Sequence, residues 1–304
     1  MKKDLISIED LAVKDILEIL ELTKSVKKDR SSYADSLKGK SIGLIFQKPS
    51  NRTRVSFEIG MAQLGGNSIY LGSSEIDMGV RESVKDVAGV LSRYLDGIVA
   101  RTYKHDDIKE LAMHATIPVI NGLSNRAHPC QALGDIFTIK EKKGTFKGVN
   151  LSYIGDGNNV LNSLMCAAAK AGINMKIATP KGYEPMKEVA RAAKQFAAES
   201  GSKLEFSNDP ALAACDADVL YTDVWVSMGQ EKEAKKRIRV FKKFQLNEKL
   251  LKLAKKNCLV MHCLPAHRGQ EITDSVMDSK NSIVFDQAEN RLHVQKAILL
   301  GLLA

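Results

Sequence analysis

The sequence predicts an α/β protein made of two doubly wound parallel-sheet domains. Short apolar runs of strand type alternate along the chain with helical segments of about 10–15 residues, an order typical of parallel sheets with right-handed crossovers. The alternation pauses at "TFKG" (145–148) and then resumes. A chain of 304 residues is long enough for two cores of ordinary size. We therefore expect two domains that divide near residues 140–147.

The first half is predicted to open with a helix that is capped by Ser7 and Asp10. "SIGLIF" (41–46) is a buried-strand run, and the helix that follows from about Thr53 ends at a Gly-Gly pair. By the same patterns, we expect further strands at 67–72, 97–100 and 117–120, and helices at 83–95, 105–115 and 128–144.

The second half repeats the alternation. Helices are predicted at 159–172 and 185–201, and an amphipathic helix is predicted from Glu289 to Leu303 at the end of the chain. Apolar runs predict strands at 151–155, 174–180, 203–207, 217–225 and 258–264, with a further one at 282–287.

Composition narrows the class of protein. Hydrophobic residues make up 44% and charged residues 27%, and no apolar run approaches the roughly 18 residues that span a bilayer. Five cysteines at irregular spacing favour reduced thiols, and the start of the chain has no apolar signal-peptide core. We therefore expect a cytoplasmic protein that does not enter a membrane.

The net charge of +9 has two interpretations. A basic protein can bind nucleic acid or an anionic metabolite. Alternatively, its lysines cover solvated helix faces, as in "EKEAKKRIRVFKKF" (231–244), where acidic and basic residues mix. No aromatic or Gly-rich RNA-binding pattern accompanies that stretch. We therefore favour a solvated face there.

Chemically active residues follow the strands, where ligands of parallel sheets bind. "QKPSNRTRVSFE" (47–58) places Ser50, Arg52, Thr53 and Arg54 at a strand-to-helix turn. Helix-start N–H groups, hydroxyls and two guanidiniums together favour a phosphate site, although it is not a P-loop. In the simpler alternative, Ser50 only caps the helix and both arginines are solvated.

The next two loops offer donors to a carbonyl group. Arg101 ends its strand, and "HPCQ" places His128 and Gln131 at the start of a helix. Alone, His128 is better explained as a capping or packed residue. Together, the three side chains offer donors to a carbonyl oxygen and a partner for an amide.

Three loops of the second half complete the candidates. "GDGNN" (155–159) imitates a dinucleotide fingerprint, but Val160 stands where the third glycine belongs. Asp223 ends a strand and can hold an ammonium group, or can simply cap its loop. "HCLPAHRG" (262–269), with Cys258 upstream, suggests a zinc site or a cysteine nucleophile, but its spacing matches no usual zinc pattern. We expect no metal there.

These motifs in this order resemble the aspartate/ornithine carbamoyltransferase family, and within it the ornithine branch. The resemblance covers essentially the whole chain. It rests on "SNRTR" (50–54), "HPCQ" (128–131), "GDGNN" (155–159), "DVWVSMGQE" (223–231), "HCLPAHRG" (262–269) and "AENR" (288–291). It implies a carbamoyl-phosphate domain at 1–142, an ornithine domain at 143–288 and an active site in the cleft between them. The C-terminal helix, 289–304, would pack back on the first domain.

The resemblance also implies the roles of residues. Catalysis would involve Arg101, His128, Asp223 and Cys263. Carbamoyl phosphate would be bound by Ser50, Asn51, Arg52, Thr53, Arg101, His128, Gln131, Cys263, Leu264 and Arg291. Ornithine would be bound by Asn159, Asp223, Ser227 and Met228. By analogy the Leu264–Pro265 peptide bond would be cis. Asn51 replaces the family's usual threonine, and Asp77 stands where many members carry a phosphate-binding residue from a neighbouring subunit, with Arg81 close by.

The implied reaction transfers a carbamoyl group from carbamoyl phosphate to the δ-amino group of L-ornithine, giving L-citrulline and phosphate in arginine biosynthesis. No cofactor is implied, and the partners are the two substrates and further copies of the chain, as a trimer or a multiple of trimers. Within the family, putrescine, aspartate or N-acetylornithine are alternative acceptors. Outside it, a nicotinamide-dependent dehydrogenase would use "GDGNN", and a nucleic-acid-binding protein would use the positive charge.

Overall fold

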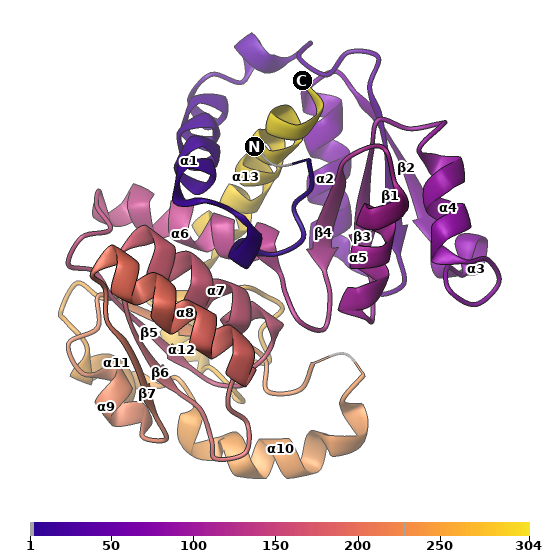
Figure 1. Cartoon of the computed structure of the whole chain (residues 1–304). Helices are drawn as coiled ribbons and strands as arrows, with labels where there is room; N and C mark the ends of the chain where they lie inside the picture. Colours follow the sequence, from indigo (N-terminus) through magenta and orange to yellow (C-terminus); the bar gives the residue numbers. More distant parts are fainter. Residues whose placement is uncertain (1–2, 228) are drawn as a thin grey trace. The chain divides into compact units, whose positions relative to one another are not determined.

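The computed structural model describes residues 3–227 and 229–304, apart from the side chain of Ser74. The chain forms two compact units, Met1–Gly134 with Glu289–Ala304, and Asp135–Ala288. Each unit contains one all-parallel sheet, which confirms the predicted fold class (Figure 1). The division falls inside helices α6 (Pro129–Lys143) and α13 (Val284–Leu303). Within the described residues, no helix is both long and apolar enough to cross a membrane.

The sheet of the first unit has the strand order β2-β1-β3-β4. Its strands are β1 (Ser41–Phe46), β2 (Asn67–Gly72), β3 (Gly97–Arg101) and β4 (Val119–Leu123). Helices α2 (Asn51–Gln63), α3 (Ser73–Ile76), α4 (Val84–Leu91) and α5 (His105–His114) connect them. Strand β2 pairs on one side of β1 and β3 on the other, so the order reverses between β1 and β3. Ligands of doubly wound sheets bind at such a reversal.

Helices cover both faces of this first sheet. One face packs on α4 and α5 through a cluster that includes Ile98, Val87 and Leu111. The neighbouring Gly97 faces the other way, because a Cβ there would lie 3.0 Å from Leu303 of α13. Gly60 of α2 likewise packs against α13. The C-terminal helix therefore packs back on the first unit, as predicted.

The sheet of the second unit has the order β7-β6-β5-β8-β9, which reverses between β5 and β8. Its strands are β5 (Asn150–Ile154), β6 (Asn174–Ala178), β7 (Leu204–Ser207), β8 (Val219–Thr222) and β9 (Leu259–His262). Helices α7 (Asn159–Ala171) and α8 (Lys187–Ser200) pack on each other, and α7 also contacts β6. The unit also contains α9 (Pro210–Ala214), α10 (Ala234–Phe241), α11 (Glu248–Leu253) and α12 (Asp274–Met277).

Two predictions about the ends of the chain were wrong. Ser7 donates a 2.8 Å hydrogen bond to Asp10, but Ile8–Asp10 form only a 3-10 turn, and helix α1 (Val13–Lys28) begins later. The run at 282–287 is not a strand, because α13 already begins at Val284 and only Ser282 forms an isolated bridge, to Val260. A short apolar run in the sequence cannot distinguish a strand from the buried start of a helix.

Candidate active site

The turn after β1 has the local features of an anion site. Ser50 is the N-cap of α2, and its hydroxyl accepts the Thr53 N–H at 3.2 Å. Helix α2 thus presents its free N–H groups and the positive end of its dipole beside the sheet reversal. Asn51 and Arg52 are exposed on its first turn, whereas Thr53 is buried.

Arg101 lies across the same reversal, at the end of β3, and its side chain is only 6% exposed. Burial lowers the pKa of Arg101 from 12.5 to about 10, and repulsion by Arg291 and Arg52 adds to this effect. Among the described residues, no carboxylate forms an ion pair with Arg101, and its Nε has no hydrogen-bond acceptor. The guanidiniums of Arg52 and Arg291 are therefore close enough to repel that of the buried Arg101. This repulsion favours a bound anion.

Arg291 of α13 joins the other elements of this cluster. Its guanidinium donates to the Gln131 amide oxygen at 2.7 Å and to the Thr53 hydroxyl at 3.2 Å. Gly134 of α6 lies beside the Arg291 side chain, because a Cβ there would be in ordinary contact with it at 3.6 Å. Helices α2, α6 and α13 thereby share one polar centre in the first unit.

His128 is buried at the start of α6, beside these arginines. Burial lowers the pKa of His128 well below 6.5, and the charges of Arg291 and Arg101 lower it further. The imidazole is therefore neutral at pH 7, so one ring nitrogen carries a proton that it can donate. A neutral donor, His128, and a cationic donor, Arg101, thus lie in the same cluster, and together they can polarise a carbonyl oxygen.

Arg54 does not join the anion site that the sequence suggested. Its Nε donates to Glu58 at 2.9 Å, and its guanidinium lies 3.8 Å from the centre of the Tyr70 ring. Residues at i and i+4 share a helix face, which explains the pairing with Glu58. Of the two arginines in "SNRTR", only Arg52 remains with the cluster.

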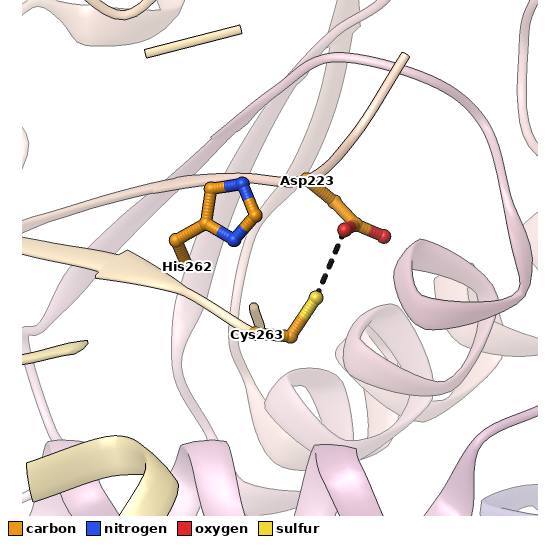
Figure 2. Close-up of side chains that lie close together, drawn as sticks. All are labelled: Asp223, His262 and Cys263. Carbon is orange, nitrogen blue, oxygen red and sulfur yellow. Dashed lines mark hydrogen bonds between the residues drawn. The ribbon is translucent and has the colours of Figure 1, made fainter. Parts of the chain in front are cut away.

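Asp223, which directly follows β8, is the centre of a hydrogen-bonded cluster in the second unit (Figure 2). Its carboxylate accepts the Asn158 amide at 2.7 Å, the Cys263 thiol at 2.9 Å and the Val224 N–H at 2.8 Å. Asn158 follows β5, so its bond with Asp223 spans the reversal between β5 and β8. A buried carboxylate held by neutral donors can bind an ammonium group.

Cys263 is a thiol in this arrangement. Burial raises the pKa of Cys263 well above 9.0, and the negative charge of Asp223 raises it further. The thiol consequently donates a proton in its hydrogen bond to Asp223 and is not a nucleophilic thiolate.

A second buried carboxylate of the same unit, Asp135, is also fully hydrogen-bonded. Tyr221 donates to one of its oxygens at 3.0 Å, and Gln287 donates to the other oxygen at 2.7 Å.

His262 precedes the thiol and is fully buried. With Asp223 and Cys263 it places three ligand-type atoms within 4.8 Å of one another (Figure 2). However, the Nδ1 atom of His262 accepts the Leu264 N–H at 2.9 Å, and Nε2 lies 3.1 Å from a Glu271 oxygen. Both nitrogens of His262 are thus engaged within the loop, whereas Cys263 donates to Asp223.

Leu264 and Pro265 form the turn after β9. The peptide bond between them is cis, as the resemblance implied, and Leu264 has a φ of 57°. A leucine in the left-handed region is rare and is typical of a loop whose shape serves a function. The turn directly follows Cys263, which is largely buried.

The loop after β5 is filled by protein where a dinucleotide would bind. A Cβ on Gly157 would lie 2.3 Å from the Glu184 backbone, and the Gly157 N–H donates to the Tyr183 carbonyl at 2.9 Å. In a dinucleotide fingerprint, the second glycine leaves room for the pyrophosphate. Here it leaves room for the chain itself, which argues against the dehydrogenase alternative.

The remaining predicted residues border this loop and the next. Asn159 is the first residue of α7, and its neighbour Asn158 is the N-cap that contacts Asp223. Only Asn159 was predicted from the sequence. The N-cap position before α7 was the signal that could have identified Asn158. Ser227 is half-buried, and its N–H donates to Gln230 at 3.0 Å. Met228 lies outside the described residues.

Comparisons with known proteins agree with these motifs. The family described as "Aspartate/ornithine carbamoyltransferase, carbamoyl-P binding domain" matches residues 3–141, and its "Asp/Orn binding domain" matches 147–302. "Ornithine carbamoyltransferase, anabolic" of Pyrococcus furiosus is 54% identical over 299 residues, which are 98% of this chain and 95% of the relative. "Ornithine carbamoyltransferase, catabolic" of Thermoplasma acidophilum is 50% identical over 303 residues, 100% and 99% of the two chains.

A solved structure extends this likeness to three dimensions. The ornithine carbamoyltransferase from Pyrococcus furiosus superposes with a TM-score of 0.95 at 54% identity, covering 97% of this chain and 95% of that one. The strand-end loops that carry the candidate residues therefore belong to a fold shared over nearly the whole chain.

Proposed function

The chain belongs to the aspartate/ornithine carbamoyltransferase family, and from this premise we propose that it transfers the carbamoyl group of carbamoyl phosphate to the δ-amino group of L-ornithine. The products are L-citrulline and phosphate. The observation that carries the proposal is the buried Arg101 cation, which has Arg52 and Arg291 as its charged neighbours. A dianionic phosphate compound would relieve their mutual repulsion.

The first unit binds and activates the donor. Carbamoyl phosphate is held by Ser50, Asn51, Arg52, Thr53, Arg101, His128, Gln131 and Arg291, with Cys263 and Leu264 contributed by the second unit. Arg101 and the neutral His128 stabilise the oxyanion that forms when the amine attacks, where one lost donor typically costs about 2.7–4 kcal/mol. The mixed anhydride already has a good leaving group, so neither a covalent enzyme intermediate nor a cofactor or metal is required.

The second unit binds the acceptor. Ornithine is held by Asn159, Asp223, Ser227 and Met228. Asp223 binds the δ-ammonium and accepts its proton before attack, while Cys263 remains a thiol and keeps the carboxylate oriented. Transfer also requires the amine and the carbonyl carbon to be brought within bonding distance, which can supply several kcal/mol. We therefore assign both sets of residues to one reaction.

We extend the proposal to the domain boundaries, the oligomeric state, the cellular location and the metabolic role of the protein. The carbamoyl-phosphate domain spans 1–142 with 289–304, and the ornithine domain spans 143–288. A homotrimer, or a multiple of trimers, would cover the apolar side chains of Val55, Ile59 and Ile69, which are 47%, 43% and 52% exposed on α2 and β2. Five free thiols suit a reducing cytoplasm. The more similar of the two relatives named above is anabolic, which supports a role in arginine biosynthesis.

One assay tests the activity and the choice of acceptor. The protein is supplied with carbamoyl phosphate and, separately, with L-ornithine, putrescine, L-aspartate or N-acetyl-L-ornithine, and the ureido product is measured. We expect turnover with ornithine that exceeds the other three by orders of magnitude. Preferential turnover of putrescine or N-acetylornithine would assign the protein to that acceptor instead. No ureido product from any of the four would contradict the proposal.

A further inference from the structure

We propose that Arg237 and Asp156 form a positioning pair that holds the ornithine-binding loop in its active conformation. The loop is the segment from Asp223 to Arg237, which contains Ser227, and it is called the acceptor segment below. The inference rests on the proposed function, because it concerns how that function's acceptor is bound. Neither residue of the pair is assigned to the substrates above.

Arg237 is the unexpected member of a lysine- and arginine-rich helix. Instead of extending into solvent, its side chain is only 7% exposed on α10. Its Nη1 lies 3.0 Å from the Asp156 carboxylate and donates at 3.0 Å to the backbone carbonyl of Trp225. Its Nε donates to Glu233 at 3.2 Å. One guanidinium thus holds two points of the acceptor segment to a residue that follows β5.

Aromatic rings fix the plane of this guanidinium. The Arg237 group lies 4.9 Å from the Tyr183 ring centre, and the Phe241 ring lies 4.9 Å from the same tyrosine at a steep angle. Trp225 stacks on Phe241 at 5.9 Å. A planar cation that is stacked and bonded in several directions cannot be replaced by the single point charge of a lysine.

Both ends of the acceptor segment are anchored to the same short loop after β5. Asn158 holds Asp223 at the first end, and Asp156 holds Arg237 at the second. The loop itself is immobilised, because Gly157 packs against the backbone of Glu184. Ser227 lies between the two anchors. Breaking the second anchor should therefore loosen the acceptor segment while Asp223 stays in place.

A purely structural explanation is weaker. Taking two charges out of water costs free energy that their attraction often does not repay, so buried ion pairs contribute little net stability. A control is available in the same unit, where Lys255 pairs with Asp218 at 2.8 Å. Those residues precede β9 and β8, so they lie at the opposite edge of the parallel sheet from the carboxyl ends that carry Asp223 and Asp156.

The test compares Arg237→Met, Arg237→Lys and Asp156→Asn with Lys255→Met. We expect the KM for L-ornithine to rise by about tenfold or more in Arg237→Met, equivalent to ~1.4 kcal/mol, and by less in the other two pair variants. The KM for carbamoyl phosphate should stay within about twofold. Lys255→Met should leave both constants unchanged.

The single tryptophan gives a readout that does not depend on turnover. Trp225 is 2% exposed and belongs to the acceptor segment, so acrylamide should quench its fluorescence more strongly in Arg237→Met than in the wild type or in Lys255→Met. Arg237→Lys and Asp156→Asn provide the same comparison if Arg237→Met does not fold.

Several outcomes would overturn the inference. An unchanged KM for ornithine in folded variants of the pair would do so. Rises in the KM values of both substrates, in proportion to the fall in Tm, would do so too. Unchanged quenching would also overturn it. An inactive wild type would contradict the proposed function instead, and the quenching comparison would then still decide whether the pair holds the segment.

Discussion

Replacing Arg101 by methionine should damage catalysis and stabilise the fold at the same time. Arg101 is a buried cation, and in the described part of the chain it forms no ion pair with a carboxylate, so the unliganded fold bears the cost of its desolvation. Methionine keeps a similar apolar stem but removes the charge. The two effects have opposite signs because the proposed partner of the cation is the substrate.

The expected magnitudes follow from the site. Burial and the neighbouring arginines lower the pKa of Arg101 from 12.5 to about 10. At about 1.36 kcal/mol per pKa unit, this depression corresponds to roughly 3 kcal/mol, which is an upper limit. Because the folded pKa is the lower one, the cost is fully present at pH 7 and is relieved only as pH rises through about 10. Loss of one oxyanion donor should lower kcat by about 10²–10³-fold.

The assay pairs steady-state kinetics with urea unfolding at pH 7 and low salt. Arg101→Met should have a higher unfolding midpoint than the wild type without ligand. Addition of phosphate should raise the Tm of the wild type by mass action and raise that of the variant much less. Arg126→Met is the matched control, because Arg126 already pairs with Glu9 at 3.1 Å in the same unit. It should lose a little stability and keep its activity.

The reasoning would be refuted if Arg101→Met kept near-normal kcat/KM, or if phosphate stabilised the variant as strongly as the wild type. Strong destabilisation without phosphate would contradict the argument as well, because it would mean that the charge is already paired in the fold.

Three further predictions concern the second unit. Asp223→Asn should raise the KM for L-ornithine and lower kcat while sparing the KM for carbamoyl phosphate, and unchanged ornithine saturation would count against the assignment. Burial raises the pKa of Asp156 from 3.8 to about 6, so its contribution to stability should fall by about 3 kcal/mol as pH rises between these values. Asp156→Asn should remove that slope from urea titrations at pH 4 to 7. Asn158→Ala should cost about 0.5–2 kcal/mol through loss of the α7 cap and should also impair ornithine binding, whereas Asn159→Ala should leave the cap intact.

The strand-end loops were the part of the site that the sequence could predict. Parallel strands place their carboxyl ends at one edge, so the order of apolar runs and polar loops was enough to assign Ser50, Arg101 and His128 to neighbouring loops. Helix-start chemistry also predicted that Ser50 caps the following helix, and Ser50 is indeed the N-cap of α2. Local rules sufficed because each of these residues acts next to the end of its own strand.

Side-chain direction could not be predicted in the same way. "EKEAKKRIRVFKKF" was interpreted as a solvated face, yet Arg237 turns inward to Asp156, which is distant in sequence. Arg54 was expected beside Arg52 but pairs with Glu58. These outcomes depend on partners from other elements or on the local helix face, and composition does not encode them.

The most direct test of the central claim is to follow the new bond itself. The protein is incubated with [13C]carbamoyl phosphate and L-ornithine labelled with 15N at the δ-amino group, and the products are observed by NMR. The proposed activity predicts a ureido carbon that shows one-bond 13C–15N coupling, with one phosphate released for each citrulline formed. Release of phosphate without that coupled signal would contradict it.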